Sequence, residues 1–164
     1  MAVSEREGAC ACGAVRYRIE GDPIFVNNCH CRQCQQQTGS TSVVNAFFES
    51  DRITLLSGEL TEHVVTAGSG GPHIICRCSE CGTALWSHYP RLGRIGAGLR
   101  VGTLDDSRDI RPDAAVWVAE RMPWVALPEG IPHFDAYYDF RELLALDKIA
   151  RMDALIERRK AGEG

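Results

Sequence analysis

The sequence has no apolar stretch close to the roughly 18 residues that a membrane-spanning helix requires. Its first ten residues, MAVSEREGAC, lack the basic segment followed by an apolar segment that marks a secretory signal peptide. It has no internal repeat, and its low-complexity sequence is limited to the short run Gln35-Gln36-Gln37. These absences predict a cytoplasmic protein with no membrane partner.

Clusters of positive charge are also scarce. Arg158-Arg159-Lys160 is the basic run, and the formal net charge is −4. If seven cysteines bound two zinc ions as thiolates, the charge would move to about −7. Such a surface repels phosphate backbones, so nucleic acid is not an expected partner.

The chain has enough residues, 164, to form one domain spanning 1–164, and a domain of this size buries roughly 70% of its unfolded surface. Metal is therefore not required merely because the chain is small. Short apolar or alternating segments separated by Gly and Pro turns predict a mainly β fold. The expected strands are residues 14–19, 24–26, 42–48, 53–56, 62–65, 73–78, 83–87, 95–101 and 115–119.

The C-terminal part has a different pattern, which predicts one amphipathic α-helix over about residues 139–161. Its apolar residues recur every three or four positions, at Leu143, Leu146, Ile149, Met152 and Ile156. Asp139 is placed to cap the start of this helix, and the basic run at its end suits the helix dipole. We expect it to pack on the sheet or on a second subunit, which would make the protein a homo-oligomer.

Eight cysteines occur in three groups: Cys10-Ala11-Cys12, Cys29-His30-Cys31-Arg32-Gln33-Cys34, and Cys76-Arg77-Cys78-Ser79-Glu80-Cys81. In a reducing compartment, clustered cysteines bind metal or do redox chemistry more often than they form disulfides. A C-x-C pair in an extended segment directs two thiolates to one side, and a C-x2-C pair does so across a tight turn. The spacing favours zinc over buried free thiols, and over an iron–sulfur cluster, whose ligands come mostly from one longer run.

The number of cysteines leaves the arrangement open. Two closed tetrahedral sites would use all eight thiolates, whereas one four-cysteine site and one three-cysteine site would leave one cysteine free. A zinc ribbon pairing Cys31 and Cys34 with Cys78 and Cys81 would leave four unexplained. The spacing alone does not choose between the first two arrangements.

The order of motifs resembles a known family. C-x-C-G-x-V, N-C-H-C-R-x-C followed by Thr38-Gly39-Ser40, C-x2-C-G-T and a late Met122-Pro123-Trp124 resemble the glutathione-dependent formaldehyde-activating enzymes. That family is also called S-(hydroxymethyl)glutathione synthase and includes the centromere protein V relatives. The resemblance covers about residues 8–124 and implies a zinc-binding β-sheet fold, with the C-terminal helix as an extension.

The resemblance also implies two Zn²⁺ per chain. A structural zinc would be held by Cys10, Cys12, Cys78 and Cys81. A catalytic zinc would be held by Cys29, Cys31 and Cys34. Cys76 has no counterpart and is expected to be a buried thiol that could exchange into the structural site.

The activity implied is that of a carbon–sulfur lyase that joins glutathione to formaldehyde. Three thiolates on Zn²⁺ leave a net charge of −1, which suits a soft fourth ligand such as an incoming thiol better than hydroxide. Arg32 is the candidate to bind a glutathione carboxylate. Two alternatives stay open: a non-catalytic module that binds glutathione or a protein partner, and a redox sensor built on the C-x-C-x2-C run.

The remaining histidines and tryptophans are expected to have structural roles. His30 lies between two predicted ligands and should point away from their metal into packing. Four other histidines lack ligand spacing and are expected to be ordinary residues: His63, His73, His88 and His133. The late tryptophans Trp117 and Trp124 are expected in the core.

Overall fold

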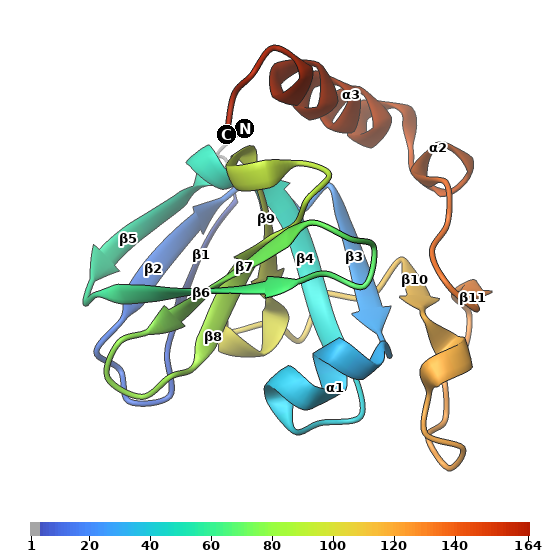
Figure 1. Cartoon of the computed structure of the whole chain (residues 1–164), viewed down its shortest axis with the longest axis horizontal. Coiled ribbons are helices and arrows are strands. Elements are labelled where there is room, and N and C mark those ends of the chain that lie inside the picture. The colour runs from blue at the N-terminus through green and yellow to red at the C-terminus, as the bar shows by residue number, and fades with distance from the viewer. Residues whose placement is uncertain (1–3) are drawn as a thin grey trace.

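The computed structural model describes residues 4–164, and the fold is mainly β, as the sequence predicts. Figure 1 shows the strands of its two sheets, ordered β1-β2-β5 and β11-β10-β3-β4-β9-β8-β7-β6. The strands are β1 (Glu5–Ala9), β2 (Arg16–Glu20), β3 (Phe25–Cys29), β4 (Val43–Glu49), β5 (Ile53–Ser57), β6 (Leu60–Thr66), β7 (Pro72–Cys78), β8 (Ala84–His88), β9 (Gly96–Arg100), β10 (Ala114–Val116) and β11 (His133–Phe134). The helices are α1 (Arg32–Thr38), α2 (Phe140–Leu143) and α3 (Leu146–Lys160).

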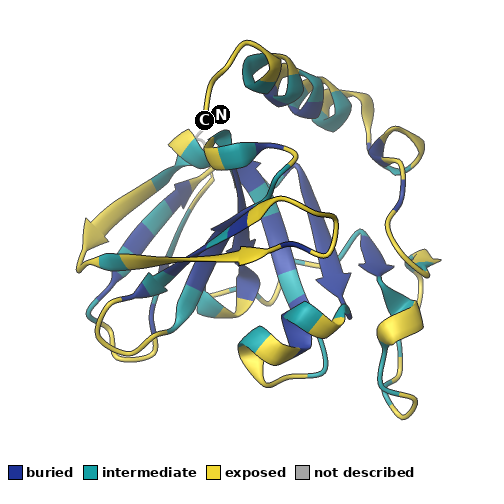
Figure 2. Ribbon diagram, in the orientation of Figure 1, coloured by how far each residue is buried: buried dark blue, intermediate teal, exposed yellow. Residues whose placement is uncertain are grey.

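A buried cluster joins the two sheets. In β2, the fully buried Tyr17 and Ile19 alternate with the half-buried Arg16 and Arg18, which is the period-2 pattern of a strand with one face in the core. The buried side chains pack with residues of β4, β8 and β9, including Phe48, Leu85 and Leu99. Figure 2 shows this buried centre and the exposed strands β5 and β6, each of which is the edge strand of a different sheet.

The C-terminal helix is divided, which corrects the prediction of one helix over about 139–161. Asp139 does act as a cap, since its carboxylate accepts a hydrogen bond from the Arg141 N–H at 3.0 Å, but this cap belongs to the short α2. Leu144 then adopts an extended conformation and is buried, and α3 begins at Leu146, which is 84% exposed. Burial of Leu144 interrupts the helix between α2 and α3. The apolar periodicity of the sequence is the same for one continuous helix and for two helices with such a break.

The helix α3 packs on this chain's own sheet (Figure 1). Its buried Met152 and Leu155 join a second buried cluster with residues of β3 and β10. The guanidinium of Arg151 donates two hydrogen bonds to the carboxylate of Glu49 at the end of β4, at 2.8 and 2.5 Å. Apolar packing and a two-pronged ion pair therefore hold the C-terminal extension in place.

Three elements were not predicted from the sequence. The strand β1 and the two-residue β11 carry few large apolar residues, and α1 has the sequence RQCQQQT, with no apolar periodicity. The helix α1 begins after Cys31, whose sulfur accepts the Cys34 N–H, and ends at Gly39, which has a left-handed φ of 66°. Among residues 4–164, every helix is too short or too polar to span a bilayer.

Candidate metal centres

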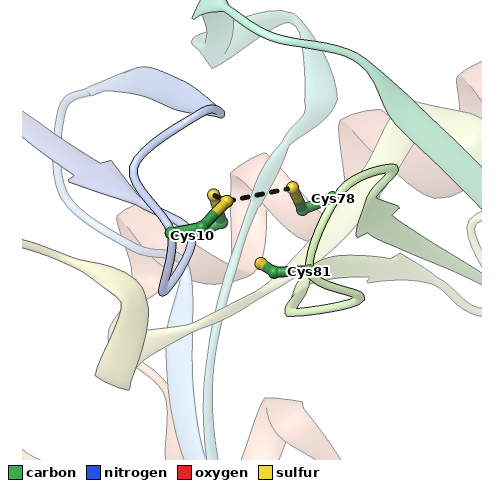
Figure 3. Close-up of side chains that lie close together, drawn as sticks. Cys10, Cys78 and Cys81 are labelled. Atoms are coloured by element: carbon green, nitrogen blue, oxygen red, sulfur yellow. Dashed lines mark hydrogen bonds between the residues drawn. The ribbon is translucent and has the colours of Figure 1, made fainter.

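The first cysteine cluster joins two turns that are far apart in the sequence. Cys10 and Cys12 lie in the turn after β1, whereas Cys78 ends β7 and Cys81 lies in the turn before β8. Their four sulfurs all lie within 4.8 Å of one another. Figure 3 shows the sulfurs of Cys10, Cys78 and Cys81 directed from the two facing loops into one space.

The turns themselves shape this cluster. The N–H of Gly13 donates to the Cys10 carbonyl and the N–H of Gly82 to the Cys78 carbonyl, both at 3.0 Å, and both glycines have positive φ. The Cys12 sulfur lies 3.5 Å from that of Cys10 and 3.9 Å from that of Cys78. In a tetrahedral site with Zn–S bonds of about 2.3 Å, the sulfurs are about 3.8 Å apart. The cluster therefore fits a tetrahedral metal ion closed by four protein ligands.

Hydrogen bonds already favour thiolate at the edge of this cluster. The hydroxyl of Thr83 lies 3.1 Å from the Cys81 sulfur. This hydroxyl, followed by the backbone N–H of Thr83, lowers the pKa of Cys81 to about 5. The Cys10 sulfur accepts the Val15 N–H at 3.2 Å. Such donors orient metal-bound sulfurs and stabilise their charge.

The second cluster contains three cysteines. Cys29 ends β3, Cys31 precedes the first residue of α1, and Cys34 lies within α1. Their sulfurs lie within 4.8 Å of one another, and among residues 4–164 no His, Cys, Asp or Glu joins them as a fourth member of the group. All three line a cavity of about 540 Å³. This cluster therefore differs from the first in ligand number and in its access to a ligand-sized space.

Charge in the second cluster is concentrated on Cys31. Hydrogen bonds from the thiols of Cys29 and Cys34, and from the Cys34 N–H at 3.3 Å, lower the pKa of Cys31 to about 2. The pKa of Cys29 is raised, chiefly by its hydrogen bond to Cys31. These hydrogen bonds favour thiolate at Cys31, and three sulfurs so close together are soft donors that fit a metal ion.

Arg100 is a buried cation beside this cluster. It is 5% exposed, and its guanidinium donates to neutral groups: Asn45 Oδ1, Ser87 Oγ at 3.0 Å, and Tyr89 Oη and Gln37 Oε1 at 3.3 Å each. Burial lowers the pKa of Arg100, but Tyr89, Cys34 and Cys29 outweigh burial and raise it. A buried charge needs compensation. Tyr89 and the sulfurs of Cys34 and Cys29 supply that compensation here.

We expect Arg100→Met to weaken metal binding at Cys29, Cys31 and Cys34. The substitution keeps the approximate length of the side chain but removes the positive charge, and the loss of a group that supports ligands costs about 10- to 100-fold in metal affinity. Release of metal to a chelator measures the effect. Arg94→Met is the control, because Arg94 forms a half-exposed ion pair with Glu62 at 2.6 Å. Equal release from both variants would contradict this role of Arg100.

The cavity combines an apolar interior with a charged rim. Its buried apolar lining includes residues of β3, β10 and the loop after β8, namely Phe25, Val116 and Leu92. The charged lining residues are exposed: Arg32, Arg91 and Glu120. The predicted binding residue Arg32 thus lies at the rim, where its N–H donates to Glu120 Oε2 and its guanidinium to Gln35 Oε1.

His73, expected to be an ordinary residue, lies on the cavity wall. It is 1% exposed and stacks on Tyr89, with ring centroids 4.4 Å apart. Its Nδ1 lies 3.1 Å from Gln33 Oε1, and its buried Nε2 has no hydrogen-bond partner among the described residues. Burial, followed by the charge of Arg100, lowers the pKa of His73 to about 4. The imidazole is therefore neutral at pH 7. His73 lies 39 positions after Cys34 in the sequence, so no local pattern indicated this placement.

The structure also places four other residues for which the sequence analysis stated an expectation. His30 is fully buried and outside both sulfur groups, consistent with a packing role. Cys76 is buried and lies outside the groups, and burial raises its pKa to about 11. The core placement of Trp124 is wrong, since it is 75% exposed. Trp117 is partly buried and packs against the second buried cluster, as expected, but it also lines the cavity, with a positive φ of 56°. Both tryptophans follow the last core strand β10 rather than continuing it.

One relative and a family profile agree with the motif resemblance. A Halomonas elongata protein named "Putative glutathione-dependent formaldehyde-activating enzyme" is 33% identical over 89 residues, which are 52% of this chain and 57% of that protein. This chain therefore spans little more than half the length of that relative. A crystal structure of a Rhodobacter sphaeroides protein has a TM-score of 0.46 at 18% identity and covers 77% of this chain and 98% of its own. The profile of the family described as "Glutathione-dependent formaldehyde-activating enzyme" matches residues 5–120, and this chain belongs to that family.

Proposed function

We propose that this protein is a zinc-dependent carbon–sulfur lyase that adds the thiol of glutathione to formaldehyde or another small aldehyde. The observation that carries the proposal is the three-sulfur cluster of Cys29, Cys31 and Cys34 on the wall of a ligand-sized cavity. Structural zinc sites are closed by four protein ligands, whereas catalytic ones keep a position open. The four-cysteine cluster is then the structural site.

The reaction joins the two substrates without oxidation or reduction. A bond forms between the thiol sulfur and the carbonyl carbon, the carbon–oxygen double bond becomes single, and the thiol proton ends on that oxygen. Zinc held by Cys29, Cys31 and Cys34 would lower the pKa of a coordinated thiol and so favour the nucleophilic thiolate. The remaining requirements are to bind the substrates, to handle one proton and to exclude bulk water.

The residues of the cavity meet these requirements. Arg32 and Arg91 at the rim are matched in number and charge to the two carboxylates of glutathione. The free Nε2 of the neutral His73 can accept the proton that the thiol loses and return it to the new alkoxide oxygen. Arg100, which neighbours the cysteine cluster but does not line the cavity, would offset the net negative charge of three thiolates around one Zn²⁺. His73 and Arg100 are both buried, and they keep this charge away from water.

The test is the rate of adduct formation from glutathione and formaldehyde in buffer, with and without the zinc-loaded protein. We expect acceleration, and we expect His73→Gln to lower the catalysed rate about 100-fold, because a positioned general base contributes about 10²- to 10⁴-fold. The control is His63→Gln, since His63 lies outside the cavity lining, on the exposed face of β6.

Adduct formation no faster than in buffer would contradict the enzymatic proposal and leave the non-catalytic zinc module that binds glutathione. If acceleration were unchanged in His73→Gln, the proton would be handled elsewhere.

A further inference from the structure

The cavity is larger and more apolar than formaldehyde requires. Its volume is about 540 Å³, within the range of about 300 to 1,000 Å³ typical of sites for whole small molecules. The charged lining residues lie at the exposed rim, so the groups of glutathione that need ionic partners would be held there. The apolar interior beside the three sulfurs would therefore bind a group other than the charged groups of glutathione.

Aromatic rings form a continuous wall in this interior. Phe25 and Phe47 stack with centroids 4.3 Å apart, Phe47 contacts Tyr89 at 5.7 Å, and Tyr89 stacks on His73 at 4.4 Å. All four residues line the cavity. Aromatic faces and edges at these spacings favour another flat apolar group. Formaldehyde, with one carbon atom, would leave this wall without contacts.

A second wall comes from the segment beyond the family match. The match ends at residue 120, yet Tyr137, Phe140 and Met152 line the cavity. Asn27 of β3 holds this segment: its amide N–H donates to Tyr137 Oη at 3.1 Å, and its amide oxygen accepts from Tyr138 Oη at 2.8 Å. The C-terminal extension therefore completes the apolar part of the cavity and is itself fixed to the sheet.

From these walls we infer that the aldehyde partner carries an apolar group of aromatic or branched aliphatic type, which binds between the aromatic wall and the C-terminal extension. This inference rests on the proposed function for the chemistry and adds the class of substrate. The thiol adds to the aldehyde carbon to give R–S–CH(OH)–R′, the thiol proton ends on oxygen, and R′ is the group buried in the cavity.

Binding of stable adduct analogues tests the inference without requiring turnover. We expect S-benzylglutathione to bind the zinc-loaded protein about 10- to 100-fold more tightly than S-methylglutathione by isothermal titration calorimetry, because the benzyl group would be buried. Tyr137→Ala should reduce this ratio at least threefold, and Tyr137→Phe, which keeps the ring, should restore it. Trp124→Ala is the control, since Trp124 is an exposed ring outside the cavity.

Rates with formaldehyde, acetaldehyde, isovaleraldehyde and phenylacetaldehyde complete the test. We expect kcat/KM to rise along this series. If the protein accelerated adduct formation with formaldehyde but showed no preference for the benzyl analogue or for the larger aldehydes, the inference would be overturned and the proposed function would stand. A benzyl preference that depends on Tyr137, with no acceleration for any aldehyde, would support the assigned pocket and overturn the enzymatic proposal.

Discussion

Cys31→Ser is expected to return the rate of adduct formation to that of buffer while the fold is retained. Cys31 carries the thiolate of the three-cysteine cluster, since its pKa is lowered to about 2 by Cys29 first and Cys34 next. A serine hydroxyl stays protonated at pH 7 and is a poor ligand for a soft metal site. The variant should therefore lose one of two zinc ions per chain, as metal analysis would show.

The fold should survive Cys31→Ser for a local reason. Cys31 is the N-cap of α1, and serine is among the preferred N-cap residues. The closed cluster is untouched by the change. Cys76→Ala is the matched control, because it removes a cysteine that belongs to neither cluster. A Cys31→Ser variant that keeps the full rate and both zinc ions would refute the assignment of this cluster as the catalytic site.

Cys78→Ser should instead destabilise the whole protein. Cys78 is 2% exposed and belongs to the four-cysteine cluster that joins the turn after β1 to the end of β7. Loss of a structural metal is among the few single changes that cost more than about 4 kcal/mol. A domain has only about 5–15 kcal/mol of total stability, so this loss would remove roughly a quarter to four fifths of it and lower the urea midpoint accordingly.

Urea unfolding followed by circular dichroism measures this effect. The comparison is again Cys76→Ala, which removes a similarly buried thiol from the same hydrophobic cluster and should cost only about 1 kcal/mol through lost packing. If Cys76→Ala were as damaging as Cys78→Ser and also released one zinc ion, Cys76 would be a ligand. That result would contradict the closed site described above.

Much of the candidate site could be predicted because its spacing is local. Cys29, Cys31 and Cys34 lie within six residues at spacings typical of metal ligands, although the spacing left the grouping of the eight cysteines open and the family resemblance supplied this group of three. Local spacing could not pair the Cys10 turn with the Cys78 turn, since these residues are far apart in the sequence. The family resemblance supplied that pairing, and the structure brings the same four sulfurs together.

The cavity could not be predicted, because its residues are far apart in the sequence. Its wall combines side chains from β3, β4, the loop after β8 and the C-terminal segment, and no local pattern links Phe25 to Tyr89 or Tyr137. His73 and Trp117 look like ordinary core residues in sequence, because only tertiary packing turns them toward the space beside the sulfurs. The break at Leu144 has a similar origin, since burial of that side chain outweighed the helical periodicity.

The most direct test uses cobalt in place of zinc and follows the visible and near-ultraviolet absorption as glutathione is added. The account predicts two cobalt ions per chain, one with an unchanging four-thiolate spectrum and one whose sulfur-to-cobalt band grows saturably with glutathione. In Cys31→Ser the responsive signal should be absent. Two four-thiolate spectra before any glutathione is added, or no response to glutathione at either ion, would contradict an open metal site at Cys29, Cys31 and Cys34.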